Sequence, residues 1–571
     1  MLDVRVIGGT VIDGTGAPGR RADIGISDGR VVAVGDVDEQ AARTIDADGL
    51  VVTPGFVDIH THYDAQLFWD PAATPSPFHG VTTVIGGNCG FTIAPVETTQ
   101  ADYLMRMLAR VEGMPLESLS TGVPWGEWRT FGELLDKLDA IGPAVNAGFL
   151  VGHSAIRRCV MGDETDRAAK PDEIDAMTQL LDAALASGGL GFSSSKAATH
   201  NDAAGHPVPS RAAELEEFLE LCRVVARHEG TTVEVIPAIA PFNADAIDLM
   251  AQMSVAAQRP VNWNVLGVSS ARPDAHVHQL AASDYASERG GRVVALTVPG
   301  PMRFHITFKT GFILDALPGW APIMALPPVE KMAALRDPAV RQQLRDGAMS
   351  DEAGGLRTMA NWPHILIVET FAPENAGLAG RTFGDVARER GGDVFDVVCE
   401  IVLADELRTV MLPRTWSDDD ETWKMRAATW QDPRVVLGAS DAGAHLDMID
   451  TFNYTTTMLA ACRDRGLLPI EHAVRLLTDT PARLYGMNGR GRVADGWFAD
   501  LVLFDPARIG PGPISTRFDL PGGAGRLYGE AEGISEVLVN GTAIVRDGEL
   551  TGDRPGTLLR SGRDTSTVLP V

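Results

Sequence analysis

Short apolar runs rich in β-branched residues recur through the middle of the chain, and stretches with helical periodicity separate them. Between these runs, residues 171–187 and 212–228 place apolar side chains at intervals of three and four, which is typical of amphipathic helices. Alternation of strand and helix, repeated eight times, predicts an α/β fold with a (β/α)8 TIM-like barrel, whose chemistry lies at the carboxyl ends of its strands. The eight runs are residues 54–62, 81–86, 145–152, 189–193, 231–236, 261–266, 292–297 and 435–440.

Both ends of the chain show strand patterns without intervening helices. Residues up to about Thr53 alternate short β-branched runs with Asp-Gly turns, and similar patterns return at 500–505 and 537–545. Neither end has enough apolar surface for a core of its own, so we expect the two to combine. The expected domains are a β-sandwich of residues 1–53 and 484–550, a barrel of residues 54–483, and a C-terminal arm or disordered tail at 551–571.

One connection is far too long for a barrel loop. Residues 299–432 separate the seventh and eighth strands and contain clusters of Trp, Pro and Gly. Within this segment, residues 330–344 have a helical pattern that Pro338 interrupts, and residues 365–368 have a strand pattern. We therefore expect an insertion with secondary structure of its own, and an elaboration of the barrel without a functional role is one interpretation of it.

Composition narrows the range of partners and compartments. The 571 residues include 76 acidic and 49 basic side chains, a formal net charge of −27, which repels phosphate backbones and anionic membranes. The five cysteines are odd in number and scattered, as expected for reduced thiols. No targeting segment or membrane-spanning run is visible in the sequence. These features favour a cytoplasmic protein with neither a nucleic-acid nor a membrane partner.

The strand ends carry the candidate chemistry. His60 and His62 close the first strand, and because residues i and i+2 share one face of an extended chain, both imidazoles can point at one ion. Asp441 ends the eighth strand and would face the same barrel mouth, where a carboxylate can bind the metal or accept a proton. An isolated His-x-His or Ser-Asp pair is more often structural; their joint position at strand ends favours a metal site.

Six motifs are spread over nearly the whole chain: residues 51–66, Gly86-Gly87-Asn88-Cys89-Gly90, Gly152-His153, residues 188–193, Ser440-Asp441 and Ala499-Asp500-Leu501-Val502. Together they resemble the amidohydrolase superfamily, and more narrowly the N-acyl-D-amino-acid deacylases (D-aminoacylases). The resemblance implies a barrel with a divalent metal, most simply Zn²⁺, a proton-transferring role for Asp441, a metal-binding role for Cys89, and a lid formed by the insertion.

The chain departs from this family at two strands. D-aminoacylases place a histidine at the ends of the fifth and sixth strands, but residues 232–237 and 262–267 of this chain contain none. Glu234 could supply an oxygen ligand from the fifth strand. Lys196, just past the fourth strand, could become carboxylated and bind the metal, as in the resembling hydantoinases. Alternatively, one of the histidines near strand ends or in the insertion could enter the coordination shell: His153, His200, His305 or His445.

The resulting functional hypothesis is metal-assisted hydrolysis of an amide C–N bond in a small molecule, most simply an N-acyl-(D-)amino acid. We expect the substrate to carry a carboxylate, and the candidate substrate-binding residues are His153, Lys196, His200, Arg303 and His445, with Arg157 and Arg158 as further cations. Two alternatives stay open: a hydrolase of cyclic amides, dipeptides or carbamates on the same scaffold, and a metal-poor binding protein. The sequence also leaves open whether one or two ions bind and whether the protein is a homo-oligomer.

Overall fold

The computed structural model describes residues 1–238, 241–311, 313–414 and 417–570, and its centre is a ring of parallel strands. Strands β6, β7 and β8 pair in that order, and β9 to β13 continue to β16. Leu150 joins β8 to β9, and a parallel bridge from Thr61 to Ala442 connects the first strand to the eighth. The predicted (β/α)8 barrel is thereby confirmed. Its third strand is interrupted at Leu150 and consists of β8 (Asn146–Phe149) and β9 (Val151–Gly152). The other seven strands are β6 (Phe56–Asp58), β7 (Val81–Gly86), β10 (Gly191–Ser195), β11 (Thr232–Ile236), β12 (Val261–Trp263), β13 (Val293–Thr297) and β16 (Val435–Leu437).

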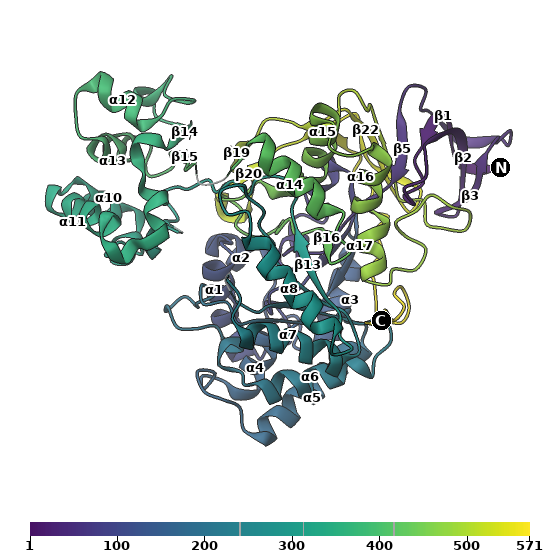
Figure 1. Ribbon diagram of the computed structural model, residues 1–571, viewed down its shortest axis with the longest axis horizontal. Helices are drawn as coiled ribbons and strands as arrows, with labels where there is room; N and C mark the ends of the chain where they lie inside the picture. The colour runs from purple at the N-terminus through teal and green to yellow at the C-terminus, as the bar shows by residue number, and fades with distance from the viewer. Residues whose placement is uncertain (239–240, 312, 415–416, 571) are drawn as a thin grey trace.

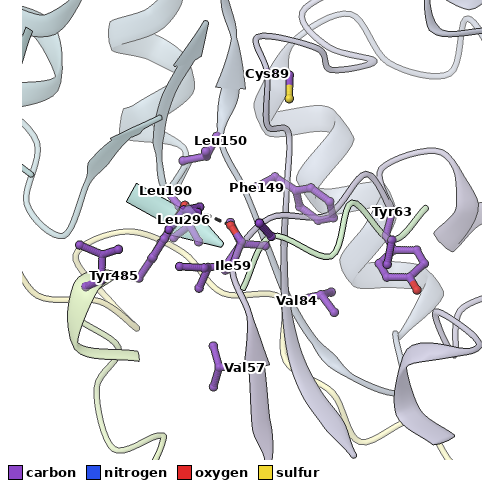
Figure 2. Close-up of a cluster of buried hydrophobic side chains, with 14 of the residues drawn as sticks. Val57, Ile59, Tyr63, Val84, Cys89, Phe149, Leu150, Leu190, Leu296 and Tyr485 are labelled. Atoms are coloured by element: carbon purple, nitrogen blue, oxygen red, sulfur yellow. Dashed lines mark hydrogen bonds between the residues drawn. The ribbon is translucent and has the colours of Figure 1, made fainter. Parts of the chain in front are cut away.

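The barrel strands contribute buried apolar side chains to the main hydrophobic core, and helices cover the outside of the barrel. Val57, Val84, Phe149 and Leu296 belong to one cluster of buried hydrophobic side chains, with Cys89 at one end of the group drawn in Figure 2. The predicted apolar stripe of α5 is buried at Met177, Leu181, Ala184 and Leu185. The helices packed around the strands include α3 (Phe131–Ile141), α4 (His153–Met161), α5 (Pro171–Ala186), α6 (Leu215–Ala226), α7 (Ala244–Ala257), α8 (Ala275–Ser287), α15 (Tyr454–Arg465), α16 (Ile470–Leu477) and α17 (Asp479–Leu484).

Strands from both ends of the chain form one nine-stranded sheet beside the barrel (Figure 1). The N-terminal and C-terminal parts meet where β5 pairs antiparallel with β17, with Pro54 opposite Leu501. Val6, Ile24 and Leu538 lie in the separate hydrophobic core of this sheet. The strands are β1 (Leu2–Val11), β2 (Arg20–Ser27), β3 (Arg30–Gly35), β4 (Ala41–Asp46), β5 (Val51–Pro54), β17 (Leu501–Phe504), β22 (Ile534–Val539), β23 (Thr542–Arg546) and β24 (Glu549–Leu550).

A buried carboxylate ties this sheet to the barrel. Asp500 forms an ion pair with Arg490, accepts the backbone N–H of Asn540 at 2.8 Å and accepts the side-chain amide of Asn146 at 3.2 Å. Asn146 opens β8, so the network runs from the barrel wall to the loop between β22 and β23. Both partners of the ion pair are almost fully buried.

We expect the Asp500→Ala variant to lose about 3–5 kcal/mol of stability, because it leaves the Arg490 guanidinium buried without its partner. Chemical denaturation followed by circular dichroism measures the effect. Asp495→Ala, on the exposed loop before β17, is the matched control and should change the free energy of unfolding by less than about 0.5 kcal/mol. Equal stability of the two variants would contradict the structural role of Asp500.

The insertion between the seventh and eighth strands folds around a core of its own and extends away from the barrel (Figure 1). Pro338 ends one helix and opens the next, because Asp337 accepts the N–H of Ala339 and caps the second helix. The insertion contains α10 (Pro328–Arg336), α11 (Pro338–Met349), β14 (Leu366–Glu369), α12 (Phe383–Arg390), α13 (Val394–Ala404) and β15 (Val410–Leu412). Residues 312 and 415–416 of the expected span 299–432 lie outside the described residues. We propose that residues 1–53 and 484–550 form the terminal β-domain and residues 54–483 the barrel domain. Residues 299–432 are the insertion within the barrel domain.

The segment after Leu550 lies along the barrel. The N–H of Leu559 donates to Ala147 O at 2.7 Å, and the N–H of Ala147 donates to Thr557 O at 3.0 Å. Further along, the N–H of Ser566 donates to Gly486 O at 2.8 Å. Of the two expectations for this end, the described part has the contacts of an extended arm; Val571 lies outside the described residues.

His79, in the turn before β7, is a buried histidine whose surroundings favour its neutral form. Its Nδ1 lies 2.8 Å from Thr456 Oγ1, and its Nε2 lies 3.1 Å from the carbonyl oxygen of Gly529. Burial lowers the pKa of His79 to about 4.

None of the described helices is long and apolar enough to cross a membrane.

The lowered pKa of His79 predicts that the folded protein becomes less stable as the pH falls. Between pH 6.5 and about 4 the unfolded chain binds a proton at His79 that the folded chain does not, so the free energy of unfolding rises with pH in this window, by up to about 3 kcal/mol from this group. The His79→Gln variant keeps an amide donor but cannot titrate, and its stability should depend less steeply on pH. Denaturant titrations at pH 4.5, 5.5 and 6.5 measure both slopes; equal slopes would contradict the prediction.

Candidate metal centre

Two imidazoles and one thiol converge at the carboxyl end of the barrel. His60 and His62 follow β6, and Cys89 follows β7. Cys89 Sγ lies 3.4 Å from His60 Nε2 and 3.8 Å from His62 Nε2, and the three ligand atoms all lie within 4.8 Å of one another. All three side chains are buried. The i, i+2 spacing of the histidines on an extended segment places them side by side, as the sequence predicts.

The loop that carries Cys89 is held by three polar side chains from neighbouring strands. Asp64 accepts the N–H of Gly87 at 3.0 Å, Ser193 accepts the N–H of Gly90 at 3.1 Å, and Glu234 accepts the N–H of Cys89 at 2.8 Å. Cys89 itself has a φ of 59°, a conformation that is uncommon outside glycine. The loop is therefore built to direct the thiol toward the imidazoles.

Asp441 completes the cluster from the eighth strand. Its Oδ1 lies 3.0 Å from His62 Nε2 and 3.4 Å from His60 Nε2. The main chain positions it through a hydrogen bond from its N–H to His60 O, with a φ of 59°. Its side chain is 20% exposed, whereas those of His60 and His62 are 0% and 2% exposed, so Asp441 is the member of the cluster that a substrate can reach.

Carboxylates dominate the electrostatics of this site. Burial raises the pKa of four nearby acids above the usual range: Asp58 and Glu112 to about 7, Asp64 to about 6 and Glu234 to about 8. Burial alone would lower the pKa of His62, but the carboxylates of Glu112 and Asp441 raise it to about 9. This excess of acidic groups over cations in a buried space favours the binding of a positive ion.

The donor set fits a divalent metal such as Zn²⁺. Tetrahedral zinc with Zn–N of about 2.0–2.1 Å and Zn–S of about 2.3 Å separates its nitrogen and sulfur ligands by roughly 3.6 Å. The measured separations of 3.4 and 3.8 Å bracket that value. Glu234 Oε1 is buried and has no hydrogen-bond partner among the described residues, so it offers a further oxygen donor. His60, His62 and Cys89 are thus the residues that would hold the ion, with Asp441 and Glu234 adjacent.

Three of the predicted site residues lie elsewhere. Lys196 Nζ donates to the backbone oxygens of Arg211 and Ala213 at 2.9 and 2.7 Å, so its ammonium is bound to a loop and does not enter the metal cluster. His153 is hydrogen bonded at both nitrogens, to Ser194 and Glu217, inside the barrel wall. Arg303 is half exposed and faces Asp418 at 3.8 Å. These contacts account for the three side chains without a ligand, and the metal and substrate roles expected of them stay predictions.

The other two candidates, His200 and His445, lie beside the centre. His200 Nδ1 lies 2.8 Å from Ser195 Oγ, and burial lowers the pKa of His200 to about 3. Burial also lowers the pKa of His445, although the nearby Asp441 carboxylate works against this lowering. Both rings are therefore neutral at pH 7, and each lies close enough to influence or be influenced by the metal cluster electrostatically.

Two residues of the centre were not singled out from the sequence. Glu112 Oε2 lies 3.6 Å from His62 Nε2, and Asn264 Nδ2 lies 3.0 Å from His60 Nε2. Glu112 follows α1 (Ala101–Val111) and continues the buried face of Leu104 and Leu108, which lie eight and four residues before it. A charged residue at the end of an apolar helical stripe is the feature of the sequence that could have identified Glu112. Asn264 follows β12, at the strand end where the expected histidine is missing.

A (β/α)8 barrel with paired imidazoles after its first strand and an aspartate after its eighth defines the class of metal-dependent amidohydrolases. The comparisons agree with this class. Residues 43–344 and 385–543 match the model described as the amidohydrolase family, and the chain belongs to that family.

Comparisons with individual proteins show which members of the family the chain is similar to. The chain is 31% identical over 570 residues to D-aminoacylase of Alcaligenes xylosoxydans xylosoxydans, covering 98% of this chain and 97% of the relative. A solved D-aminoacylase structure, from work on the functional role of its binuclear metal center, superposes with a TM-score of 0.65 at 29% identity, covering 98% and 100% of the two chains. N-acyl-D-glutamate deacylase from Bordetella bronchiseptica, complexed with zinc and a phosphonate inhibitor, gives a TM-score of 0.65 at 25% identity with the same coverage.

Proposed function

We propose that the chain is a metal-dependent deacylase that hydrolyses the amide bond of N-acyl-D-amino acids. The observation that carries this proposal is the approach of Cys89 Sγ to His60 Nε2 and His62 Nε2, at 3.4 and 3.8 Å, next to the Asp441 carboxylate. The similarity to D-aminoacylase over nearly the full length of both chains supports the substrate class.

His60, His62 and Cys89 would hold the ion, and a divalent metal there supplies polarisation of the amide carbonyl and acidification of a water molecule. Asp441 accepts the proton of the attacking water, since its carboxylate is ionised and partly exposed at the same end of the barrel. The two neighbouring imidazoles keep the pKa of Asp441 well below its usual range against the opposing effect of burial. Asp441 then returns the proton to the leaving nitrogen, because an amine departs far more readily than an amide anion.

The two alternatives are less well supported. The first is a hydrolase of cyclic amides, dipeptides or carbamates; its hydantoinase-like form would need a carboxylated Lys196 at the metal, but the Lys196 ammonium donates to two backbone carbonyl oxygens of the loop at 211–213. A metal-poor binding protein has no need of three buried ligands at coordination spacing. The deacylase proposal accounts for both features.

Metal analysis and a substrate panel test the proposal. Protein purified without chelator should contain about one divalent ion per chain held by this ligand set, measured by plasma mass spectrometry. The panel should include N-acyl-D-amino acids, their L enantiomers and cyclic imides, with amine release as the readout. Hydrolysis of the cyclic imides alone, or stoichiometric metal without any amide hydrolysis, would refute the deacylase assignment.

A further inference from the structure

His200 lies on the loop that follows β10, at the carboxyl end of the barrel strands. The His200 ring contacts the ring of Phe91, with centroids 5.2 Å apart, and Phe91 belongs to the loop that carries Cys89. The charges of Asp441 and His62 both act on His200. His200 therefore borders the metal centre from the side of the fourth strand, with its side chain partly exposed.

The hydrogen bonds of Ser195 fix which ring nitrogen of His200 carries the proton. Ser195 Oγ accepts the N–H of Ala197 at 3.1 Å and lies 2.8 Å from His200 Nδ1. Ser195 is buried, and its hydroxyl has no other acceptor among the described residues, so it donates its proton to Nδ1. The proton of the neutral His200 ring is therefore on Nε2.

The same loop keeps this ring neutral and fixed. Burial, together with the nearby Arg211 guanidinium, lowers the pKa of His200 to about 3. Arg211 also donates to His200 O at 3.1 Å and to Asn201 Oδ1 at 2.6 Å, which holds the main chain of the loop. No residue in the described part of the chain accepts a hydrogen bond from His200 Nε2, which is not fully buried. The loop thus presents a neutral N–H donor without a protein acceptor beside the metal centre.

We propose that His200 is a further catalytic residue, whose Nε2–H donates a hydrogen bond to the carbonyl oxygen of the scissile amide and to the oxyanion that this oxygen becomes. The inference rests on the proposed deacylase function and adds a second group to its chemistry. A neutral donor suits this position, because an imidazolium would repel a cation held by His60, His62 and Cys89.

The proposed step leaves the proton of His200 in place. The oxygen of the attacking water forms a bond to the carbonyl carbon while Asp441 takes the proton, and the carbonyl oxygen gains the negative charge. The hydrogen bond from His200 is stronger to this oxyanion than to the neutral carbonyl, so it lowers the barrier. When the C–N bond breaks, the C=O bond forms again and Asp441 returns the proton to the leaving nitrogen.

The His200→Phe variant tests this role, because it removes the donor and keeps a planar ring against Phe91. We expect kcat to fall about 10²–10³-fold with KM within about threefold of wild type, since the lost hydrogen bond strengthens only as charge develops. Steady-state kinetics with the N-acyl-D-amino acid that the wild type hydrolyses fastest measure both constants, and bound metal should be unchanged. His206→Phe, at an exposed position of the same loop, is the matched control and should keep the wild-type kcat.

A second readout separates catalysis from a structural role. A phosphonate that replaces the scissile amide of the same substrate is tetrahedral and negatively charged, like the oxyanion. It should bind His200→Phe about 10²-fold more weakly than wild type, whereas the amino-acid product should bind both proteins equally. Calorimetry on the metal-loaded proteins measures both affinities.

Each result decides for or against this role. Wild-type kcat in His200→Phe, a raised KM with unchanged kcat, or loss of metal together with activity would overturn the catalytic role of His200 and leave the deacylase proposal intact. Should His200→Phe fail to fold, Ser195→Ala decides, because it frees the proton to move to Nδ1: kcat should fall at least threefold, and an unchanged kcat would overturn the role. No hydrolysis of any N-acyl-D-amino acid by metal-loaded wild-type protein would overturn the proposed function and this inference with it.

Discussion

The Asp441→Asn variant is expected to lose on the order of 10³–10⁴-fold in kcat while it retains its bound metal. The amide is nearly the same size as the carboxylate and can still lie against His60 and His62, which are 3.4 and 3.0 Å from Asp441 Oδ1. It cannot accept a proton from water or deliver one to the leaving nitrogen, so the chemical step loses its acid and base together. Steady-state kinetics with the preferred N-acyl-D-amino acid, together with metal analysis, measure both quantities.

Two controls make this result specific. Asp464→Asn, an exposed position on α15 paired with Arg463, makes the same chemical change away from the centre and should leave kcat within about twofold of wild type. The melting temperature of Asp441→Asn should remain close to wild type as well. A variant with wild-type kcat would remove Asp441 from the mechanism, and one that loses metal and activity together would make it chiefly a ligand.

The fold was predictable because its elements have different periodicities. The interior strands are continuous apolar runs, buried on both faces, and α5 and α6 carry stripes that repeat every three to four residues. The Asp-Gly turns of the first 50 residues and the pattern at 500–505 were sufficient to predict that the two termini combine. What could not be predicted was the course of the segment after Leu550. Backbone hydrogen bonds to Ala147 and Gly486 and the buried pair Leu558 and Leu559 fix it, and two adjacent apolar residues are too few to form a recognisable pattern.

The centre was only partly predictable, for a geometric reason. His60, His62 and Asp441 occur at strand ends, and the position of a strand end is fixed by the barrel itself. Residues on loops and helix ends are placed by tertiary contacts that the sequence does not display. Lys196 follows a strand closely yet its ammonium is bound to the 211–213 loop, whereas Glu112 is far from any strand and its carboxylate lies against His62.

The two strands without histidine show how this chain departs from its relatives. Glu234 lies within the fifth strand and Asn264 directly follows the sixth, and both contact the cluster, Glu234 through the N–H of Cys89 and Asn264 through His60 Nε2. Neither residue has an imidazole, so the thiol of Cys89 and the two histidines after the first strand remain the best-placed ligands. The centre therefore depends on Cys89 more than it would with additional histidine ligands.

We accordingly expect the Cys89→Ser variant to bind metal on the order of 100-fold more weakly, with a proportional loss of activity at limiting metal. A thiolate is a far stronger zinc ligand than a hydroxyl. Replacing a residue that only hydrogen bonds to a metal ligand lowers metal affinity about 10–100-fold, so replacing one of the three ligands themselves should lower it at least as much. Burial raises the pKa of the Cys89 thiol well above its usual value, so the thiolate forms only when a cation is bound. Metal binding should therefore release a proton from the wild-type protein.

Competition with a chromophoric chelator measures the affinity, and calorimetry in two buffers of different ionisation enthalpy measures the released proton. Cys159→Ser, a partly exposed thiol on α4, is the matched control and should leave affinity and proton release unchanged. Excess metal should restore much of the activity of Cys89→Ser, because the hydroxyl occupies the same place and His60 and His62 still bind. Wild-type affinity in the Cys89→Ser protein would show that the thiol lies beside the ion without binding it, and the ligand set would then consist of the imidazoles and carboxylates.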